Sequence, residues 1–406
     1  MHTAKSQTRL VFVQYGDFAD AFERFSSGGR ENYYGQRYTV DHVGVLAERH
    51  EAVSVIHFSG DAPLRTLSNG VRAMGVDLYP PGLSPRDTDL IGAVQALQPT
   101  HLVVAAPIPR LIRWGIDRGL QVLPLFADSF RAAGWRQRLR NWRLQRLLND
   151  RRIRWVANHN IAASLDLERI GVRPGKILPF DWPALISPAQ YEAKVAPQGA
   201  GFRLVYVGQL TFAKGVGDLL QGFAALPRAA GFRLTLIGSG PEEAKLRELA
   251  ASLGISERTD FAGKISHDDV LAAMRDHDAV IVPSRHEYPE GLPMTIYEAL
   301  CTRTPVLASD HPMFMLRLVG DENCVLFPAS SPQALAAAVL RLRSSPALYE
   351  RLSKNSANAE ADYLCPLKWH VLLDLWLEGG PASEAQLAEF CLAASRPRAA
   401  AEVRPA

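Results

Sequence analysis

Short apolar segments of strand length alternate with helical patterns along almost the whole chain, and this alternation constrains the fold most strongly. In the first half, strands are expected at 9–14, 53–58, 76–79, 101–106, 121–126, 155–158 and 176–180. In the second half, they are expected at 202–208, 232–238, 260–263, 279–283 and 306–308. Strands that are separated by helices pair in parallel, with helices covering both faces of the sheet. The pattern predicts an α/β protein with two doubly wound parallel units.

A segment that contains Pro, Ala and Gly and has little periodicity separates the two units, as is typical of a linker. The length of 406 residues allows two to three domains, each with its own core. We expect a first domain at 1–183, a linker at 184–201, a second domain at 202–363, C-terminal helices at 364–395 and a frayed tail at 396–406.

Composition excludes several classes of protein. No apolar run approaches the roughly 18 residues that a membrane span needs, and Met1 to Arg9 lacks the apolar core of a secretion signal, so the expected compartment is the cytoplasm. The four cysteines include no Cys-x-x-Cys pair, which argues against a disulfide framework or a zinc site. The net charge of +3 is too small to indicate a partner by itself.

The segment 278–310 has the pattern of a buried strand, a polar loop, a short helix that begins near Pro293, and a second strand. Glu290 precedes the helix, and Glu298 lies within its first two turns. Carboxylates accept hydrogen bonds from the neighbouring hydroxyls of a sugar or a ribose. Unpaired amides at a helix start attract phosphate. The amides expected to do so belong to Gly291, Leu292, Met294 and Thr295.

These two glutamates, the small helix after the first and the Thr304-Pro305-Val306 strand resemble the signature of retaining glycosyltransferases of the GT-B fold, family four, also called glycosyl transferases group 1. The resemblance is strong from 204 to 346 and looser before that. It implies two Rossmann-like domains facing across a cleft, with the last helices crossing back to the first domain. It also implies metal-independent, retaining hexosyl transfer from a nucleotide-diphosphate sugar to an acceptor hydroxyl, without a cofactor.

The resemblance also implies roles for single residues. Glu290 would hold hydroxyls of the donor sugar near the reacting carbon, Glu298 the ribose, and Lys214 the diphosphate. Loops that follow earlier strands would complete the donor site from both domains. Their residues are Gly28, Gly29, Gly208, Gln209, Gly238, Gly240, Pro241, Lys264 and Ile265.

One position departs from the pattern of the family. Gln209 stands where relatives usually carry an arginine that pairs with the diphosphate, and a glutamine contributes hydrogen bonds but no charge. Lys214 then has more of the leaving-group charge to stabilise, and Arg285 is a candidate to supply what is missing.

In the first domain, polar residues follow the carboxyl ends of expected strands, where doubly wound sheets bind ligands. They are Asp128, Asn158 to Asn160 and Asp181, and we expect acceptor contacts among them. Asn160 is better explained as the cap of a helix over 161–170. His159 is a catalytic candidate, as a base or a hydroxyl donor, but it also fits a satisfied loop residue. His42 is expected to be structural or exposed.

The segment 130–156 holds nine arginines and one acidic residue. Trp135, Leu139, Trp142 and Arg146 follow a helical spacing, so an apolar stripe lies beside a basic face. Such a helix suits an anionic membrane surface, here through Arg131 to Arg154. It also suits a sheet-covering helix whose apolar positions serve the core. RNA binding is disfavoured because no base-stacking module accompanies the charge.

The expected partners are a nucleotide-sugar donor and a saccharide or lipid-linked saccharide acceptor of polysaccharide biosynthesis, and no nucleic acid. The enzyme would be cytoplasmic or peripheral at the inner face of the membrane. Two alternatives stay open: a sugar-nucleotide epimerase, and a weakly active nucleotide-sugar-binding scaffold, the latter suggested by Gln209 and by the altered loop at Asp310.

Overall fold

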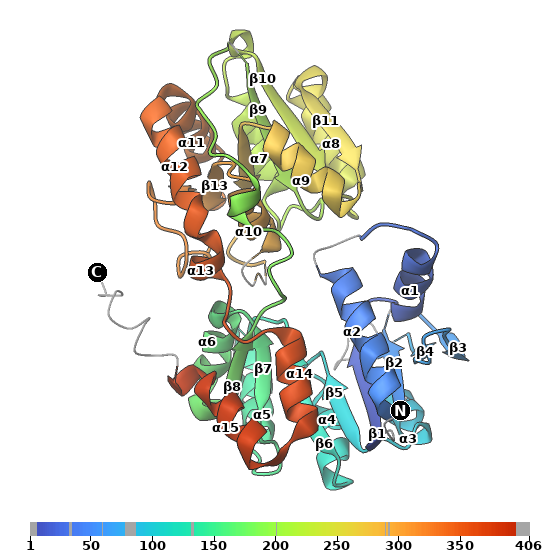
Figure 1. Cartoon of the computed structure of the whole chain (residues 1–406). Coiled ribbons are helices and arrows are strands. Elements are labelled where there is room, and N and C mark those ends of the chain that lie inside the picture. The colour runs from blue at the N-terminus through green and yellow to red at the C-terminus, as the bar shows by residue number, and fades with distance from the viewer. Residues whose placement is uncertain are drawn as a thin grey trace. The chain divides into compact units, whose positions relative to one another are not determined.

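The chain forms two compact domains in a computed structural model that describes residues 6–31, 35–58, 60–77, 87–130, 134–199, 201–288, 290 and 293–394 (Figure 1). The first domain comprises the described residues up to Pro183 together with those from Cys365 onward. The second domain comprises the described residues of Ala184–Leu364. Among the described residues, no helix combines the length and the hydropathy that a membrane span requires.

The first domain is built on a sheet with the strand order β3-β4-β2-β1-β5-β6-β7-β8. Only β3 pairs antiparallel, with β4, and the other neighbouring strands are parallel. The strands are β1 (Ser6–Gln14), β2 (His50–His57), β3 (Ala62–Thr66), β4 (Arg72–Gly75), β5 (His101–Val104), β6 (Gln121–Phe126), β7 (Val156–His159) and β8 (Ile177–Phe180).

Helices cover both faces of this sheet because alternate residues of its central strands are apolar on both sides. On β1, Leu10 and Phe12 pack in one core cluster, and Val11 and Val13 in another. The first face carries α1 (Phe18–Ser26), α2 (Gln36–Arg49), α14 (Trp369–Glu378) and α15 (Gly380–Glu389). The second face carries α3 (Asp87–Ala96), α4 (Pro109–Asp117), α5 (Trp135–Leu148) and α6 (Ile161–Arg169).

The second domain has an all-parallel sheet with the order β11-β10-β9-β12-β13-β14. Its strands are β9 (Phe202–Val207), β10 (Phe232–Ile237), β11 (Thr259–Gly263), β12 (Ala279–Val282), β13 (Val306–Ser309) and β14 (Val325–Phe327). Its helices are α7 (Val216–Ala224), α8 (Glu243–Ser252), α9 (His267–Asp276), α10 (Met294–Cys301), α11 (Pro332–Ser344), α12 (Pro346–Asn355) and α13 (Ala359–Tyr363). The strand order reverses between β9 and β12, and sheets of this type bind ligands beyond the carboxyl ends of the strands at that point.

The chain returns to the first domain after α13. The backbone of Asp181, just past β8, donates to Leu367 O and accepts from Trp369 N. Trp369, Leu372 and Leu373 of α14 are buried in the same core cluster as the residues of β8, and Figure 1 shows α14 and α15 beside the first sheet. The C-terminal helices are therefore part of the first domain.

The expected α/β architecture with two parallel sheets is confirmed, and the differences are local. β3 and β14 were not predicted. β4 covers Arg72–Gly75, whereas the third expected strand was placed at 76–79, of which 78 and 79 lie outside the described residues. The final tryptophan-rich helix starts at Trp369, because Cys365–Lys368 is held against the strand end at Asp181.

A helix, α1, follows the first strand, in a segment for which no element was predicted. The Asp17 side chain caps it by accepting from Asp20 N at 3.0 Å, and Phe18, Ala21 and Phe25 lie buried at helical spacing. The apolar residues of this segment are spaced three and four apart, which fits one face of a helix.

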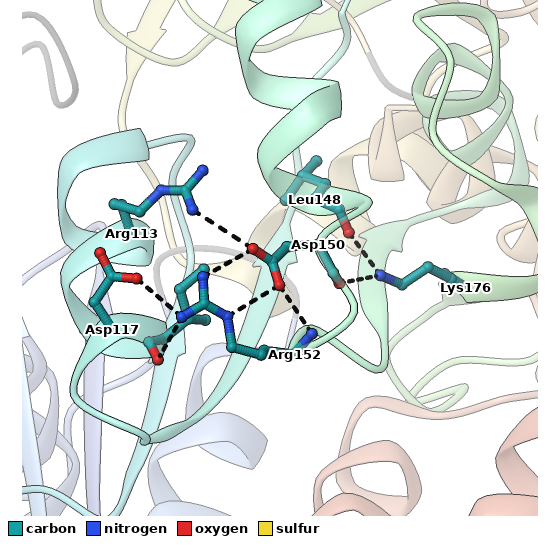
Figure 2. Close-up of polar contacts among 7 residues, drawn as sticks. Arg113, Asp117, Leu148, Asp150, Arg152 and Lys176 are labelled. Carbon is teal, nitrogen blue, oxygen red and sulfur yellow. Dashed lines mark hydrogen bonds and ion pairs between the residues drawn. The ribbon is translucent and has the colours of Figure 1, made fainter.

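The end of α5 is anchored by a cluster of charged residues (Figure 2). Lys176 Nζ donates to Leu148 O and Asp150 O, both at 2.8 Å, and thus satisfies carbonyls at the end of the helix. Arg152 hydrogen-bonds both oxygens of Asp150, which lowers the pKa of that carboxyl to about 2. Burial lowers the pKa of Lys176 to about 8. These contacts give α5 a fixed position on the first sheet.

Candidate functional site

Lys214 lies in the turn between β9 and α7, at the carboxyl edge of the second sheet. The next residue, Gly215, has a φ of 74°, and a Cβ atom there would come within 1.9 Å of Pro283 O. Arg285 N donates to Ala213 O at 3.1 Å. The turn after β9 therefore packs directly on the segment after β12, and only glycine permits this approach.

Glu290 meets Lys214 at this place. Its Oε1 atom accepts from Lys214 Nζ at 2.5 Å and from Ser284 Oγ at 2.6 Å. The Lys214 ammonium also lies 4.3 Å from the centre of the Tyr288 ring. Only 6% of Glu290 is exposed, so this charge is largely removed from water and is matched by a cation and a hydroxyl.

Glu298 lies on α10 and pairs with a different residue. Its Oε1 is 2.9 Å from Nε2 of His267, the first residue of α9, and 5% of Glu298 is exposed. Met294 and Thr295, at the start of α10, are half-buried. Gly291 and Leu292, which were expected to present amides, lie outside the described residues.

Glycines bring the loops after β9 and β10 together. Gly238 has a φ of 133°, and a Cβ atom there would meet Gly208 O at 1.9 Å. Only glycine permits this approach.

Gln209, the residue after Gly208, is exposed, and its carbonyl accepts from the buried Tyr206 hydroxyl at 2.7 Å. Burial, helped by the nearby Glu290 charge, raises the Tyr206 pKa well above its usual range, so this hydroxyl acts as a neutral donor. The remaining predicted residues follow neighbouring strands, Gly240 and Pro241 after β10 and Lys264 and Ile265 after β11.

Arg285, the candidate for the missing arginine charge, lies in an ion pair. Its Nε and Nη2 donate to the two carboxylate oxygens of Asp218, on the first turn of α7, at 2.7 and 2.8 Å. The hydrogen bonds to Asp218 raise the Arg285 pKa. The pair ties the segment after β12 to α7, and the charge of Arg285 is already matched in the absence of a ligand.

Gly28 and Gly29 follow α1 in the first domain and end this helix. Gly28 has a φ of 80°, and its N donates to Phe25 O at 3.1 Å. The N of Gly29 donates to Arg24 O at 2.7 Å. A glycine in the left-handed region is the usual end of a helix, so local structure alone accounts for the pair.

His159 and Asp181 form an ion pair at the carboxyl edge of the first sheet. His159 Nε2 is 2.9 Å from Asp181 Oδ1, and the His159 ring packs edge to face on Trp182 at 4.6 Å between centroids. Asp181 Oδ2 accepts from Cys365 N. Asp181 is 1% exposed, so it is a buried carboxylate that lies beside the imidazole as an ion-pair partner and holds the start of the returning segment by a hydrogen bond.

The other polar residues at this edge have structural partners. Asn158 donates to Asp128 O at 3.0 Å and to Ala163 O at 2.9 Å, and Asn160 caps α6 by accepting from Ala162 N at 2.9 Å, as predicted. Asp128 Oδ2 is buried and has no hydrogen-bond partner among the described residues. Burial raises the Asp128 pKa to about 6. His42 lies on α2 against α14, 3.4 Å from Asp374.

Four residues of the second-domain site were missed by sequence reasoning: Ser284, Tyr288, His267 and Asp218. Ser284 follows β12 directly, so its place at a strand end was a usable signal. His267 and Asp218 carry no such signal, because their importance comes from contacts with Glu298 and Arg285, which lie 31 and 67 residues away. The described residues contain no group of three or more His, Cys, Asp or Glu side chains arranged to hold a metal ion.

The second-domain residues therefore gather around the reversal point of the sheet. Lys214 supplies a cation for a phosphate group, whereas Glu290 and Glu298 supply acceptors for hydroxyls. A ligand that carries both phosphate and hydroxyl groups would replace the Lys214–Glu290 pair with its own contacts to these two side chains.

Comparison with known proteins is consistent with this geometry. Residues 190–359 match the family described as Glycosyl transferases group 1. The chain is 31% identical to glycogen synthase of Mycobacterium tuberculosis over 162 residues, which are 39% of this chain and 38% of that protein. It is 31% identical to the lipopolysaccharide core biosynthesis glycosyltransferase LpsD of Rhizobium meliloti over 172 residues, 41% of this chain and 47% of that protein. The chain thus spans less than half the length of these curated relatives.

Solved structures show the same fold over nearly the whole chain. Anabaena HepE, in complex with UDP and glucose, superposes with a TM-score of 0.65 at 15% identity and covers 94% of this chain and 98% of its own. Sucrose-phosphate synthase from Thermosynechococcus elongatus superposes with a TM-score of 0.63 at 18% identity and covers 94% and 97%. The chain therefore has the GT-B fold.

Proposed function

We propose that the chain transfers a sugar from a nucleotide-diphosphate sugar to an acceptor hydroxyl, a proposal supported by the match of residues 190–359 to the family described as Glycosyl transferases group 1. The observation that carries the proposal is the meeting of Lys214, Ser284 and Glu290 at the reversal point of the second sheet. A cation and a buried carboxylate side by side suit a ligand that has both phosphate and hydroxyl groups.

Donor binding would separate the Lys214–Glu290 pair. The diphosphate takes the Lys214 ammonium, and the sugar hydroxyls replace it as donors to Glu290. Ser284 keeps its hydrogen bond to Glu290 Oε1 and thereby holds the carboxylate in place during this exchange. Since the leaving group gains negative charge as the glycosidic bond breaks, Lys214 stabilises the transition state more than the ground state.

Glu298 would bind the ribose hydroxyls, with His267 as its orienting partner at 2.9 Å. His267 also stands at the N-terminal end of α9, next to its capping residue Ser266. The resemblance to family four supports the assignment of Glu298, because the position matches the second glutamate of that signature.

We assign a retaining mechanism without a metal ion. The bond between the anomeric carbon and the diphosphate oxygen breaks, a bond to the acceptor oxygen forms on the same face, and the acceptor proton passes to the leaving phosphate. Lys214 and the amides at the start of α10 compensate the diphosphate charge, and Gln209 adds a neutral hydrogen-bond donor. His159, held by Asp181, is assigned to the acceptor hydroxyl.

The acceptor class is a lipid-linked or growing saccharide. Relatives named for lipopolysaccharide core biosynthesis and for amylovoran biosynthesis support this choice. The arginine-rich α5, which has no acidic residue, supports a peripheral contact with an anionic membrane surface.

The proposal is tested by incubating the full chain with UDP-, GDP-, ADP- and TDP-sugars and following release of the nucleoside diphosphate with and without a lipid-linked saccharide. One donor is expected to be consumed, faster with the acceptor than without it. Consumption of a donor that is converted to its epimer without release of nucleotide would identify an epimerase. Binding of a donor without turnover on any acceptor would identify a scaffold.

A further inference from the structure

Helix α5 has two apolar faces, and only one of them is buried. Asn141, Leu144, Leu147 and Leu148 pack on the first domain. Trp135, Leu139 and Trp142 are 71%, 39% and 48% exposed. At about 100° per residue these three lie within one narrow stripe on the side of the helix opposite the buried residues. The interpretation that they serve the core is therefore wrong.

Arginines flank this exposed stripe. Arg136, Arg138, Arg140, Arg143 and Arg146 all lie on α5, which carries no acidic residue. Arg136 stacks on Trp135 at 5.4 Å from the ring centre, and Arg146 on Trp142 at 4.3 Å. Five positive charges around exposed tryptophan and leucine complement a surface that is both anionic and apolar beneath. Arg131, at the start of the basic segment, lies outside the described residues.

A cavity of about 690 Å³ opens beside the stripe. Its walls include Arg138, Asn141 and Trp142 from α5, and Asp166, Arg169 and Ile170 at the end of α6. Arg169 is paired with the buried Asp166. The Asn141 amide is engaged by Phe130 O and Gln137. Among the described residues Arg138 forms no side-chain hydrogen bond or ion pair, so the cavity keeps one uncompensated positive charge at its rim.

We propose that this cavity holds the phosphate of an anionic lipid headgroup while Trp135, Leu139 and Trp142 enter the interface of the bilayer. Arg138 and the guanidinium of Arg169 would share the phosphate oxygens, and Trp142 forms the wall common to the cavity and the stripe. The inference rests on the proposed function, in which the acceptor is reached at a membrane surface, and it names the part of the chain that recognises that surface.

A lipid is favoured over a free anion because the two features are continuous. A free phosphate would account for Arg138, but it would leave three large apolar side chains on the same helix exposed to water. Tryptophan beside arginine is the combination that partitions into the membrane interface, where the ring lies at the boundary between headgroups and acyl chains and the guanidinium among the phosphates. The lipid phosphate and the exposed stripe are therefore explained by one occupant.

The test is co-sedimentation of the full chain with vesicles of phosphatidylcholine alone or mixed with phosphatidylglycerol. We expect binding only to the mixed vesicles. Arg138→Gln should weaken that binding about fivefold, the loss of one charge contact at a membrane surface. Trp135→Ala with Trp142→Ala should weaken it about tenfold, although no charge changes.

The matched control for the cavity is Arg143→Gln, which removes an exposed charge from the same helix but not from the cavity wall. Both single variants alter exposed side chains, so both should fold. The proposal predicts a larger loss for Arg138→Gln than for Arg143→Gln. Equal losses of vesicle binding in the two variants would contradict a phosphate site in the cavity and would indicate a diffuse electrostatic attraction of the whole helix. If the double tryptophan variant bound vesicles as tightly as the wild type, insertion of the exposed apolar stripe into the bilayer would be contradicted. Binding of inorganic phosphate at Arg138 without any binding to vesicles would overturn the lipid as the occupant.

Failure of this inference is separable from failure of the proposed function. Stabilisation by a nucleoside diphosphate, measured as a thermal shift in the absence of vesicles, depends on the second domain and should be unchanged in Arg138→Gln and in the tryptophan variant. If no nucleoside diphosphate stabilises the wild-type chain, the proposed function fails, whatever the vesicles show.

Discussion

Glu290 in the second domain and Asp181 in the first domain are both buried carboxylates, and each is paired with one basic side chain. Lys214 lies 2.5 Å from Glu290, and His159 lies 2.9 Å from Asp181. The remaining partners differ. Glu290 accepts its second bond from the Ser284 hydroxyl, whereas Asp181 accepts from the backbone of Cys365, where the chain returns to the first domain.

The different partners indicate that Glu290 serves ligand binding, whereas Asp181 stabilises the fold of the first domain. Among the described residues, the Glu290 carboxylate accepts hydrogen bonds from side chains alone. A ligand that brings its own hydroxyls and phosphate can replace Lys214 at little cost. The partners of Asp181 include a main-chain segment whose position brings α14 onto the sheet. Removing the carboxylate at Glu290 should therefore harm activity, and removing it at Asp181 should harm stability.

The largest expected effect is that of Lys214→Ala on turnover. Loss of the cation at the leaving diphosphate should lower kcat about 100-fold or more, roughly 3 kcal/mol, with little change in the unfolding temperature. The assay is release of the nucleoside diphosphate from the donor sugar. Lys245→Ala, an exposed lysine on α8, is the matched control and should retain wild-type turnover. Turnover of Lys214→Ala within about tenfold of wild type would remove Lys214 from the leaving-group site.

Asp181→Asn should show the opposite profile. The substitution removes the carboxylate charge beside His159 and can turn an N–H instead of an oxygen toward Cys365 N, so we expect a loss of about 2–3 kcal/mol in the free energy of unfolding. Urea denaturation measures this loss. His159→Gln removes only the side-chain partner and should cost less, while it lowers transfer to the acceptor and spares donor binding. Equal stability of Asp181→Asn and wild type would show that the returning segment does not depend on this carboxylate.

Asp128 sharpens the comparison, because its buried Oδ2 has no partner among the described residues. Burial raises the pKa of its carboxyl from 3.8 to about 6, so the folded state binds the proton more tightly than the unfolded state. Stability should then fall as pH rises from about 4 to 6 and stay level above that range. Asp128→Asn should be more stable than wild type by about 3 kcal/mol at pH 8 and nearly equal to it at pH 4. The readout is urea unfolding at both pH values, and a difference that did not change with pH would contradict the burial of this charge.

The smallest effect is expected for His267→Ala. It removes one hydrogen bond to Glu298, which would otherwise hold the carboxylate toward the ribose, and it should weaken nucleotide affinity about fivefold, roughly 1 kcal/mol. Calorimetry with a nucleoside diphosphate measures the change. Glu298→Gln provides the comparison and should weaken binding at least as much. Unchanged affinity in both variants would place the ribose elsewhere.

The sequence predicted the second domain better than the first. Its strands are continuous apolar runs that end in glycine-containing turns, so periodicity located β9, β10 and β12 within one or two residues. The meeting of Lys214 with Glu290 follows from topology, because both come after strands that are neighbours in the sheet. The partners His267 and Asp218 could not be found this way, since their contacts depend on side-chain directions that no local pattern encodes.

In the first domain, local patterns were ambiguous where two explanations shared the same residues. The Gly28–Gly29 pair fits the end of α1 as well as a ligand loop, so its place in the donor site stays a prediction. The apolar spacing of α5 fitted a core face, yet Leu144, Leu147 and Leu148 occupy the core and leave both tryptophans exposed. Periodicity reveals that a helix has apolar stripes, and only packing shows which stripe is buried.

Calorimetric titration of the wild-type chain with UDP, GDP, ADP and TDP, repeated on Lys214→Ala and His159→Gln, tests the central claim most directly. The account predicts that at least one nucleoside diphosphate binds the wild type, that Lys214→Ala weakens this binding about tenfold or more, and that His159→Gln leaves it within about twofold. Absence of binding by all four nucleotides, or equal affinity of wild type and Lys214→Ala, would contradict the placement of a nucleotide-diphosphate sugar at the second-domain site.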